Sequence, residues 1–166
     1  MVDKIVGRRA LAAELARLRA AGKRTVFTNG CFDLLHAGHV RYLREAASLG
    51  DLLVVGLNSD ASVRQFKGAG RPIVPEGDRA EVMAALEMVD YVVVFGERTA
   101  EAIVAELKPD VYVKGGDYRP EELPEARVVE GYGGQVTLLP YHEDRSTTGI
   151  IQRIMDAYCS GHPGTA

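Results

Sequence analysis

Short apolar runs alternate with amphipathic stretches along this chain. Five runs are rich in aliphatic and aromatic residues, at 24–28, 51–57, 91–95, 111–113 and 136–139. Most are continuous rather than alternating, which is typical of strands buried on both faces of a parallel sheet. Strands that alternate with helices predict the α/β class: one Rossmann-like domain with a five-stranded parallel sheet and helices on both faces.

The helices are predicted from apolar residues at helical spacing. One such stripe joins Val82, Leu86 and Val89. Thr99 is expected to cap the helix that follows the third strand, and Ser146 or Thr147 the last helix. The segments 66–78 and 115–123 are rich in Gly, Pro and charge, so we expect two long loops there, the first mobile without ligand.

Length and charge limit the classes of protein to consider. The chain has 166 residues, which suits one domain over 1–166 with a core at about 24–155 and a frayed tail at 160–166. A formal net charge of −3 gives no general attraction for nucleic acid or an anionic membrane. No run is long enough to span a bilayer, and two cysteines form no disulfide framework. We therefore expect a cytoplasmic protein.

Polar clusters follow four of the predicted strands directly, at 28–39, 58–60, 114–118 and 142–148. Ligands of open parallel sheets bind at the carboxyl ends of the strands. The pattern therefore predicts one site at that edge of the sheet, without defining its chemistry.

The segment 28–39 carries the strongest signal. Its glycines allow a ligand close to the backbone, and a helix that begins near Ala37 directs free N–H groups at an anion. His36 and His39 lie in that first turn, so the segment is suited to holding phosphate. A solvated helix start and a metal-binding histidine pair are the alternatives, but Cys31 and Cys159 give the pair no companion ligands. No dinucleotide or P-loop glycine pattern occurs.

These residues also resemble a known family. Gly30-Cys31-Phe32-Asp33 followed by His36-Ala37-Gly38-His39 is similar to the first signature of the nucleotidyltransferase superfamily that includes the cytidylyltransferases, and Ser146-Thr147-Thr148 resembles the second. Further segments resemble the nucleotidyltransferase domain of ADP-heptose synthases, over about residues 24–155. These segments are Asn58-Ser59-Asp60, Lys67-Gly68, Arg71-Pro72-Ile73, Glu76, Arg79 and Lys114-Gly115-Gly116-Asp117-Tyr118.

The resemblance implies an adenylyltransferase that transfers AMP from ATP to a heptose 1-phosphate by direct in-line displacement. A cytidylyltransferase for a small alcohol phosphate, an FMN adenylyltransferase and a nucleotide-binding regulatory module are the alternatives. Relatives that use CTP often carry an arginine where this chain has Tyr141, and Asp144-Arg145 replace a Gly-Ile pair. The first departure favours ATP, and the second leaves the role of Arg145 open, as is that of His142.

The resemblance also implies residue roles. His36, His39 and Lys67 are expected to act on the transferred phosphate, while Cys31 as a nucleophile is disfavoured because no base is evident in its segment. The expected nucleotide- and phosphate-binding residues are Asn29, Gly30, Cys31, Phe32, Asp33, Gly38, Lys114, Gly115, Gly116, Asp117, Ser146, Thr147 and Thr148. The expected sugar phosphate-binding residues are Asn58, Asp60, Arg71, Arg79 and Tyr118.

The cofactor and partner expectations are few. No carboxylate cluster marks a protein metal site, so Mg²⁺ is expected to arrive with ATP, with Asp33 as a candidate contact. ATP and a sugar 1-phosphate are the expected ligands, and the resemblance to the family implies a homodimer. Because the chain has no room for a kinase domain, a separate heptose kinase is expected to supply the substrate.

Overall fold

A five-stranded, wholly parallel sheet forms the centre of the computed structural model, which describes residues 3–116, 119, 122–140 and 146–159. The strand order is β3-β2-β1-β4-β5, and every neighbouring pair is parallel. The strands are β1 (Thr25–Gly30), β2 (Leu52–Asn58), β3 (Tyr91–Phe95), β4 (Val111–Gly115) and β5 (Gln135–Leu139). The predicted fold class is confirmed, and each predicted strand is present with its ends shifted by at most two residues.

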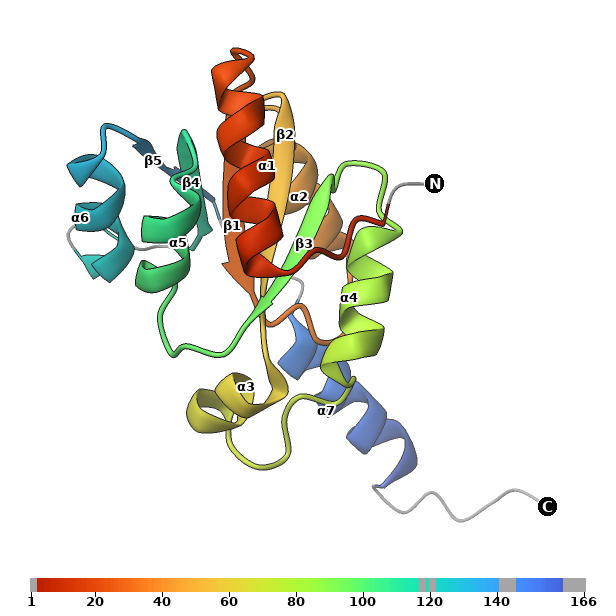
Figure 1. Ribbon diagram of the computed structural model, residues 1–166. Coiled ribbons are helices and arrows are strands. Elements are labelled where there is room, and N and C mark those ends of the chain that lie inside the picture. The colour runs from red at the N-terminus through yellow and green to blue at the C-terminus, as the bar shows by residue number, and fades with distance from the viewer. Residues whose placement is uncertain (1–2, 117–118, 120–121, 141–145, 160–166) are drawn as a thin grey trace.

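Helices cover both faces of this sheet (Figure 1). One face packs against α1 (Arg8–Ala20), α5 (Glu101–Leu107) and α6 (Pro124–Gly131), and the other against α2 (Ala37–Ala47) and α4 (Glu76–Ala84). Each face has its own buried cluster, around Phe27 and Tyr112 on the first and around Val26 and Val113 on the second. Burial on both sides is why the strands read as continuous apolar runs.

Two further helices lie beyond the end of the sheet, α3 (Asp60–Lys67) and α7 (Thr147–Tyr158). Figure 1 shows both below the sheet, α3 in yellow and α7 in blue. Ser146 caps α7, as predicted, and its hydroxyl accepts the amide of Gly149. No helix in the described part of the chain has the length and apolar character needed to cross a membrane.

Several local predictions are wrong. The stripe Val82, Leu86 and Val89 is not a helix face, because α4 ends at Ala84 and buries Arg79, Ala80 and Met83 instead. Ala100, not Thr99, is the N-cap of α5, and the Thr99 hydroxyl donates to Glu101.

The first predicted loop is also shorter than expected. The helix α3 occupies 60–67, which leaves only 68–75 as a connection to α4. Lys67 therefore lies in the last turn of a helix rather than in a loop. No apolar stripe predicts α3 or α6, because each helix is only eight residues long. The predicted tail at 160–166 lies outside the described residues.

Candidate active site

The turn that follows β1 builds the first wall of the site. Phe32 has a φ of 42°, a left-handed conformation that is strained for a residue with a side chain and is found where a turn must aim its groups. The Phe32 ring folds back over Gly30, where a Cβ atom would lie only 3.0 Å from the ring. The same ring meets His39 edge-on, with 5.3 Å between ring centroids. The strained turn and the glycine together place Phe32 against the first turn of α2.

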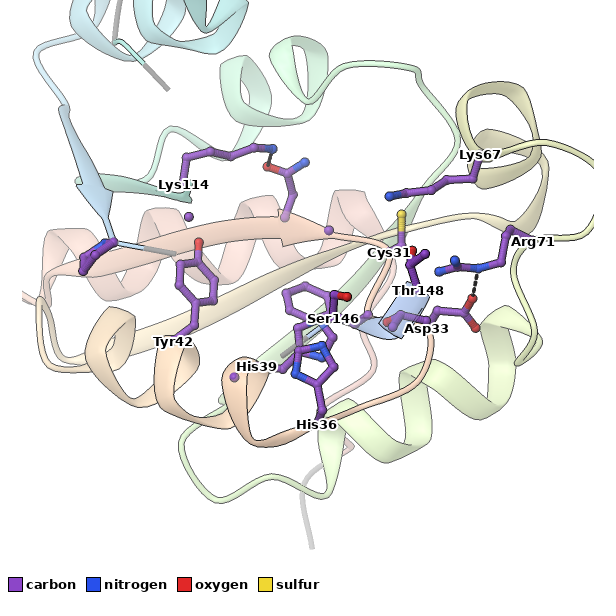
Figure 2. A pocket seen from close by; sticks show the side chains of 17 residues that line it. Cys31, Asp33, His36, His39, Tyr42, Lys67, Arg71, Lys114, Ser146 and Thr148 are labelled. Atoms are coloured by element: carbon purple, nitrogen blue, oxygen red, sulfur yellow. Dashed lines mark hydrogen bonds and ion pairs between the residues drawn. The ribbon is translucent and has the colours of Figure 1, made fainter. Parts of the chain in front are cut away.

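Two stacked imidazoles stand at the start of α2. His36 is the N-cap and His39 lies one turn along; their ring centroids are 3.8 Å apart at an interplanar angle of 21°. Burial, and after it the charge of His36, lowers the pKa of His39 to about 4. His39 is therefore neutral at pH 7 and offers a single N–H donor. Figure 2 shows the two rings side by side in the pocket.

The start of α7 meets the start of α2, although more than a hundred residues separate them. The Thr147 hydroxyl donates to the Leu34 carbonyl at 3.3 Å, which ties the cap of α7 to the turn before α2. Ser146 and Thr148 line the same cavity as His36. Two helix N-termini thus point at one space, and both their free N–H groups and their dipoles favour an anion there.

Three cationic side chains complete the positive character of this space. Lys67 comes from the end of α3, Arg71 from the loop before α4, and Lys114 from β4. Figure 2 shows the Lys67 ammonium directed toward Cys31. Burial lowers the pKa of the Lys114 ammonium, which therefore gains more from an anionic ligand than a solvated lysine does.

Asp33 fixes the loop that carries Arg71. Its fully buried carboxylate accepts hydrogen bonds from Arg71 Nε at 2.6 Å and from the amides of Ile73 and Val74, each at 2.9 Å. Burial acts to raise the pKa of Asp33, but these amides and the guanidinium outweigh it and leave the pKa below its ordinary value. The structure thus shows a carboxylate that holds this loop; Asp33 also lines the cavity, and its expected contact with nucleotide or Mg²⁺ stays a prediction.

These elements surround one cavity of about 250 Å³. It is lined by Asn29, Gly30, Cys31, Phe32, Asp33, His36, Gly38, His39, Tyr42, Lys67, Arg71, Lys114, Gly115, Pro140, Ser146, Thr147 and Thr148. Fifteen of these seventeen were expected from the sequence; Tyr42 and Pro140 were missed. Tyr42 lies three residues after His39, on the same helix face, and that spacing is the signal that could have found it.

Tyr42 forms a wall next to β4. Its hydroxyl lies 2.6 Å from Thr28 Oγ1 and donates to the Val113 carbonyl at 3.2 Å. A Cβ atom at Gly115 would lie 2.9 Å from the Tyr42 ring, so a glycine is needed for this close contact. Tyr42 and Gly115 thus line the cavity side by side at the end of β4.

Three expected sugar phosphate contacts are placed elsewhere. Arg79 is fully buried, and its guanidinium donates to the carbonyls of Val74, Cys31 and Asn58 and to Asp60. The Asn58 side chain donates to Ser62 inside the fold. None of Asn58, Asp60 and Arg79 lines the cavity. Their hydrogen bonds instead connect the segments that surround it. Arg71 does line it.

The remaining expected positions either do not line the cavity or lie outside the described residues. Gly116 follows β4 but does not line the cavity. Six predicted or unassigned positions lie outside the described residues: Asp117, Tyr118, Tyr141, His142, Asp144 and Arg145.

Comparisons with known proteins identify the group to which this fold and site belong. The cytidylyltransferase-like family matches residues 27–153. This chain belongs to the cytidylyltransferase-like family. It is therefore a nucleotidyltransferase, and the two signatures seen in the sequence, at residues 30–39 and 146–148, both lie inside the matched region.

Named relatives agree with this membership. The chain is 54% identical over 156 residues to "Bifunctional protein HldE" of Pelobacter propionicus, which covers 94% of this chain and 32% of that protein. It is 56% identical over 151 residues to the protein of the same name from Geotalea uraniireducens, covering 91% and 31%. This nucleotidyltransferase chain thus spans about a third of the length of these relatives.

Solved structures give the same fold. The lipopolysaccharide core biosynthesis protein of Thermoplasma volcanium superposes with a TM-score of 0.59 at 32% identity, covering 72% of this chain and 97% of that one. A pantoate-beta-alanine ligase of Francisella tularensis, in a complex described as with "Beta-gamma ATP and Beta-alanine", has a TM-score of 0.63 at 12% identity, covering 99% of this chain and 82% of that one. The second likeness shows the fold alone.

The chemistry of Cys31 does not suit a nucleophile in this nucleotidyltransferase. Burial raises the pKa of its thiol, against the lowering influence of Lys67, Arg79 and Arg71. A thiol held protonated is a poor nucleophile. Cys31 lines the cavity and gives its carbonyl to Arg79, which accounts for it as a wall residue.

The described residues do not build a metal cage. No three His, Cys, Asp or Glu residues gather within them, and Asp33 is the one carboxylate among the described cavity-lining residues. That carboxylate already accepts hydrogen bonds from three residues of the loop before α4. A Mg²⁺ ion would find few protein ligands here, so no catalytic step is assigned to it.

Proposed function

We propose that this chain transfers the AMP group of ATP to a heptose 1-phosphate, giving an ADP-heptose and pyrophosphate. The observation that carries the proposal is the meeting of two helix N-termini, two stacked imidazoles and three cations around one cavity. Such a site offers donors and positive charge to phosphates, and its described residues include no activated nucleophile. These groups suit a direct attack by the sugar phosphate oxygen on the α-phosphorus.

Neutral and cationic side chains have different proposed roles. His39, neutral at pH 7, donates a hydrogen bond to an α-phosphate oxygen as negative charge builds there, and His36 beside it does the same. Lys67 and Arg71 offset the charge of the reacting phosphates. Ser146–Thr148, at the start of α7, receive the β- and γ-phosphates through backbone amides and hydroxyls. Positioning and charge stabilisation then account for the acceleration without a covalent intermediate.

ATP is the proposed nucleotide. Lys114 and Gly115 end β4, where Gly115 packs closely on Tyr42, and the base is proposed to lie beside this contact. Tyr141 replaces the arginine common in relatives that use CTP. Mg²⁺ is proposed only as the companion of ATP, held by the phosphates and water.

A heptose phosphate is the proposed acceptor because of the relatives. "Bifunctional protein HldE" and a lipopolysaccharide core biosynthesis protein are among the matches, and a sugar nucleotide is a suitable product for building a glycan. The two HldE relatives are named bifunctional, and this chain spans about a third of each of them. They therefore give no support to the separate kinase expected from the sequence, and we do not propose one.

The test is a pyrophosphate-release assay with a panel of acceptors. Heptose 1-phosphate, glycerol 3-phosphate and FMN are each supplied with ATP and with CTP. We expect pyrophosphate release only with the sugar phosphate. The kcat/KM for ATP should exceed that for CTP by about 10³-fold or more, because cytosine cannot pair with polar groups that are arranged to bind adenine. Equal rates with CTP would favour a cytidylyltransferase, and nucleotide binding without turnover on any acceptor would favour a regulatory module.

A further inference from the structure

A buried tyrosine on β4 is bonded to the edge of the cavity. In the parallel register Phe27 lies opposite Tyr112, so Asn29 and Lys114, two residues further along each strand, share that face of the sheet. Tyr112 is fully buried, and its hydroxyl donates to Asn29 Oδ1 at 2.8 Å. The Lys114 ammonium donates to the same oxygen at 3.3 Å. Figure 2 shows the bond from Lys114.

These two donors determine which way the Asn29 amide faces. An ammonium group has no acceptor, so the Asn29 atom next to Lys114 must be the oxygen. The Tyr112 hydroxyl then also donates to that oxygen. With Oδ1 occupied twice from the protein side, the NH₂ group is the part of this cavity-lining amide left to donate to a ligand.

The core fixes the Tyr112 hydroxyl in place. The Tyr112 ring stacks on Phe27, with 6.2 Å between centroids and 21° between planes. Phe27 in turn lies against Gly56 of β2, where a Cβ atom would come within 2.5 Å of the Phe27 ring. Three strands thus hold the phenol, and it has little freedom to follow the amide if that amide turns.

We propose that Tyr112 is a positioning residue for the nucleotidyl transfer. It holds the Asn29 amide with its N–H donors toward the ligand, and through the shared Oδ1 it also steadies the Lys114 ammonium. The ligand atom is an acceptor of the nucleotide, such as a phosphate oxygen. The inference rests on the proposed function for its turnover readout, whereas its binding readout needs only that the site takes a nucleotide.

The test compares two matched variants, Tyr112→Phe and Tyr132→Phe. The Tyr132 hydroxyl donates to the Pro109 carbonyl at 2.9 Å, and Tyr132 does not line the cavity. Each variant loses one tyrosine hydroxyl and the hydrogen bond that it donates, so both should lower the melting temperature slightly. Only Tyr112→Phe should lower kcat/KM, by about tenfold, the equivalent of about 1.4 kcal/mol. Equal kinetics in the two variants would overturn the proposal.

A double-mutant cycle with Asn29→Ala separates positioning from a general structural effect. If Tyr112 acts through Asn29, then Tyr112→Phe has no further effect on kcat/KM in the Asn29→Ala background. Full additivity of the two losses would contradict this route.

Asn29→Asp keeps the inference testable if Tyr112→Phe fails to fold. The carboxylate still accepts from Tyr112 and Lys114 but has no N–H to donate, so the protein should stay folded and bind ATP at least tenfold more weakly by calorimetric titration. Wild-type affinity in this variant would refute the donor role of Asn29. If wild-type protein binds ATP but transfers to no acceptor, the proposed function fails, and the ATP affinities of Tyr112→Phe and Tyr132→Phe still decide the inference.

Discussion

Replacing Arg79 with methionine removes a guanidinium that joins three segments around the cavity. The side chain is fully buried and donates to Val74 O before α4, to Cys31 O after β1, and to Asn58 O and Asp60 Oδ1 where β2 passes into α3. Methionine has a comparable length and fills much of the same space, so the loss reports the hydrogen bonds more than a cavity.

The size of the effect follows from what is left without a partner. Removing one member of a buried ion pair costs about 3–5 kcal/mol. Asp60 is 24% exposed and regains water, which lowers the cost, while the buried Asn58 carbonyl loses a donor and raises it. We expect a loss of about 3–5 kcal/mol. For a chain of this size that corresponds to a melting temperature lower by about 10 °C.

Thermal and urea unfolding of Arg79→Met measure this loss. Arg127→Met, at an exposed position on α6, is the matched control and should change stability by less than about 0.5 kcal/mol. Arg79→Lys keeps the charge but lacks the planar fork, so it should recover only part of the loss. An Arg79→Met protein with normal stability and a raised KM for the sugar phosphate would refute this reasoning and restore the substrate contact expected from the sequence.

Three further predictions concern the cavity. His39→Ala should lower kcat by about 10²-fold and weaken ATP binding much less, because its donor acts as charge develops; near-normal turnover in a folded variant contradicts this. Asp33→Asn should speed amide exchange in the loop that Asp33 holds. Since the pKa of Asp33 is depressed, wild-type stability should fall as pH drops below about 4, and the variant should lose less over that range by urea titration. Gly115→Ala should push the Tyr42 ring and weaken nucleotide binding about tenfold, whereas Gly131→Ala, in open space, should not; equal calorimetric affinities would rule this out.

The sheet and the location of the site follow from the sequence. Continuous apolar runs are possible only where both faces are buried, and that requirement led to a parallel sheet with helices on each side. Polar residues directly after those runs then had to meet at one edge. The sequence also predicts that the two histidines lie together, because residues three positions apart at the start of a helix share one face. These features depend on residues that are close in the chain.

Only the tertiary structure decided which polar side chains face the ligand. Asp33, Arg79 and Lys114 were all expected to contact the ligand, yet Arg79 is buried among carbonyls, whereas Asp33 and Lys114 line the cavity and the Asp33 carboxylate also holds a loop. The Thr147–Leu34 contact and the Tyr112–Asn29 bond join segments 113 and 83 residues apart. A local sequence pattern indicates on which face of its own helix or strand a residue lies. Its hydrogen-bond partner from another segment depends on the strand order and on the buried donors and acceptors that must be paired. Both are set only when the whole chain packs.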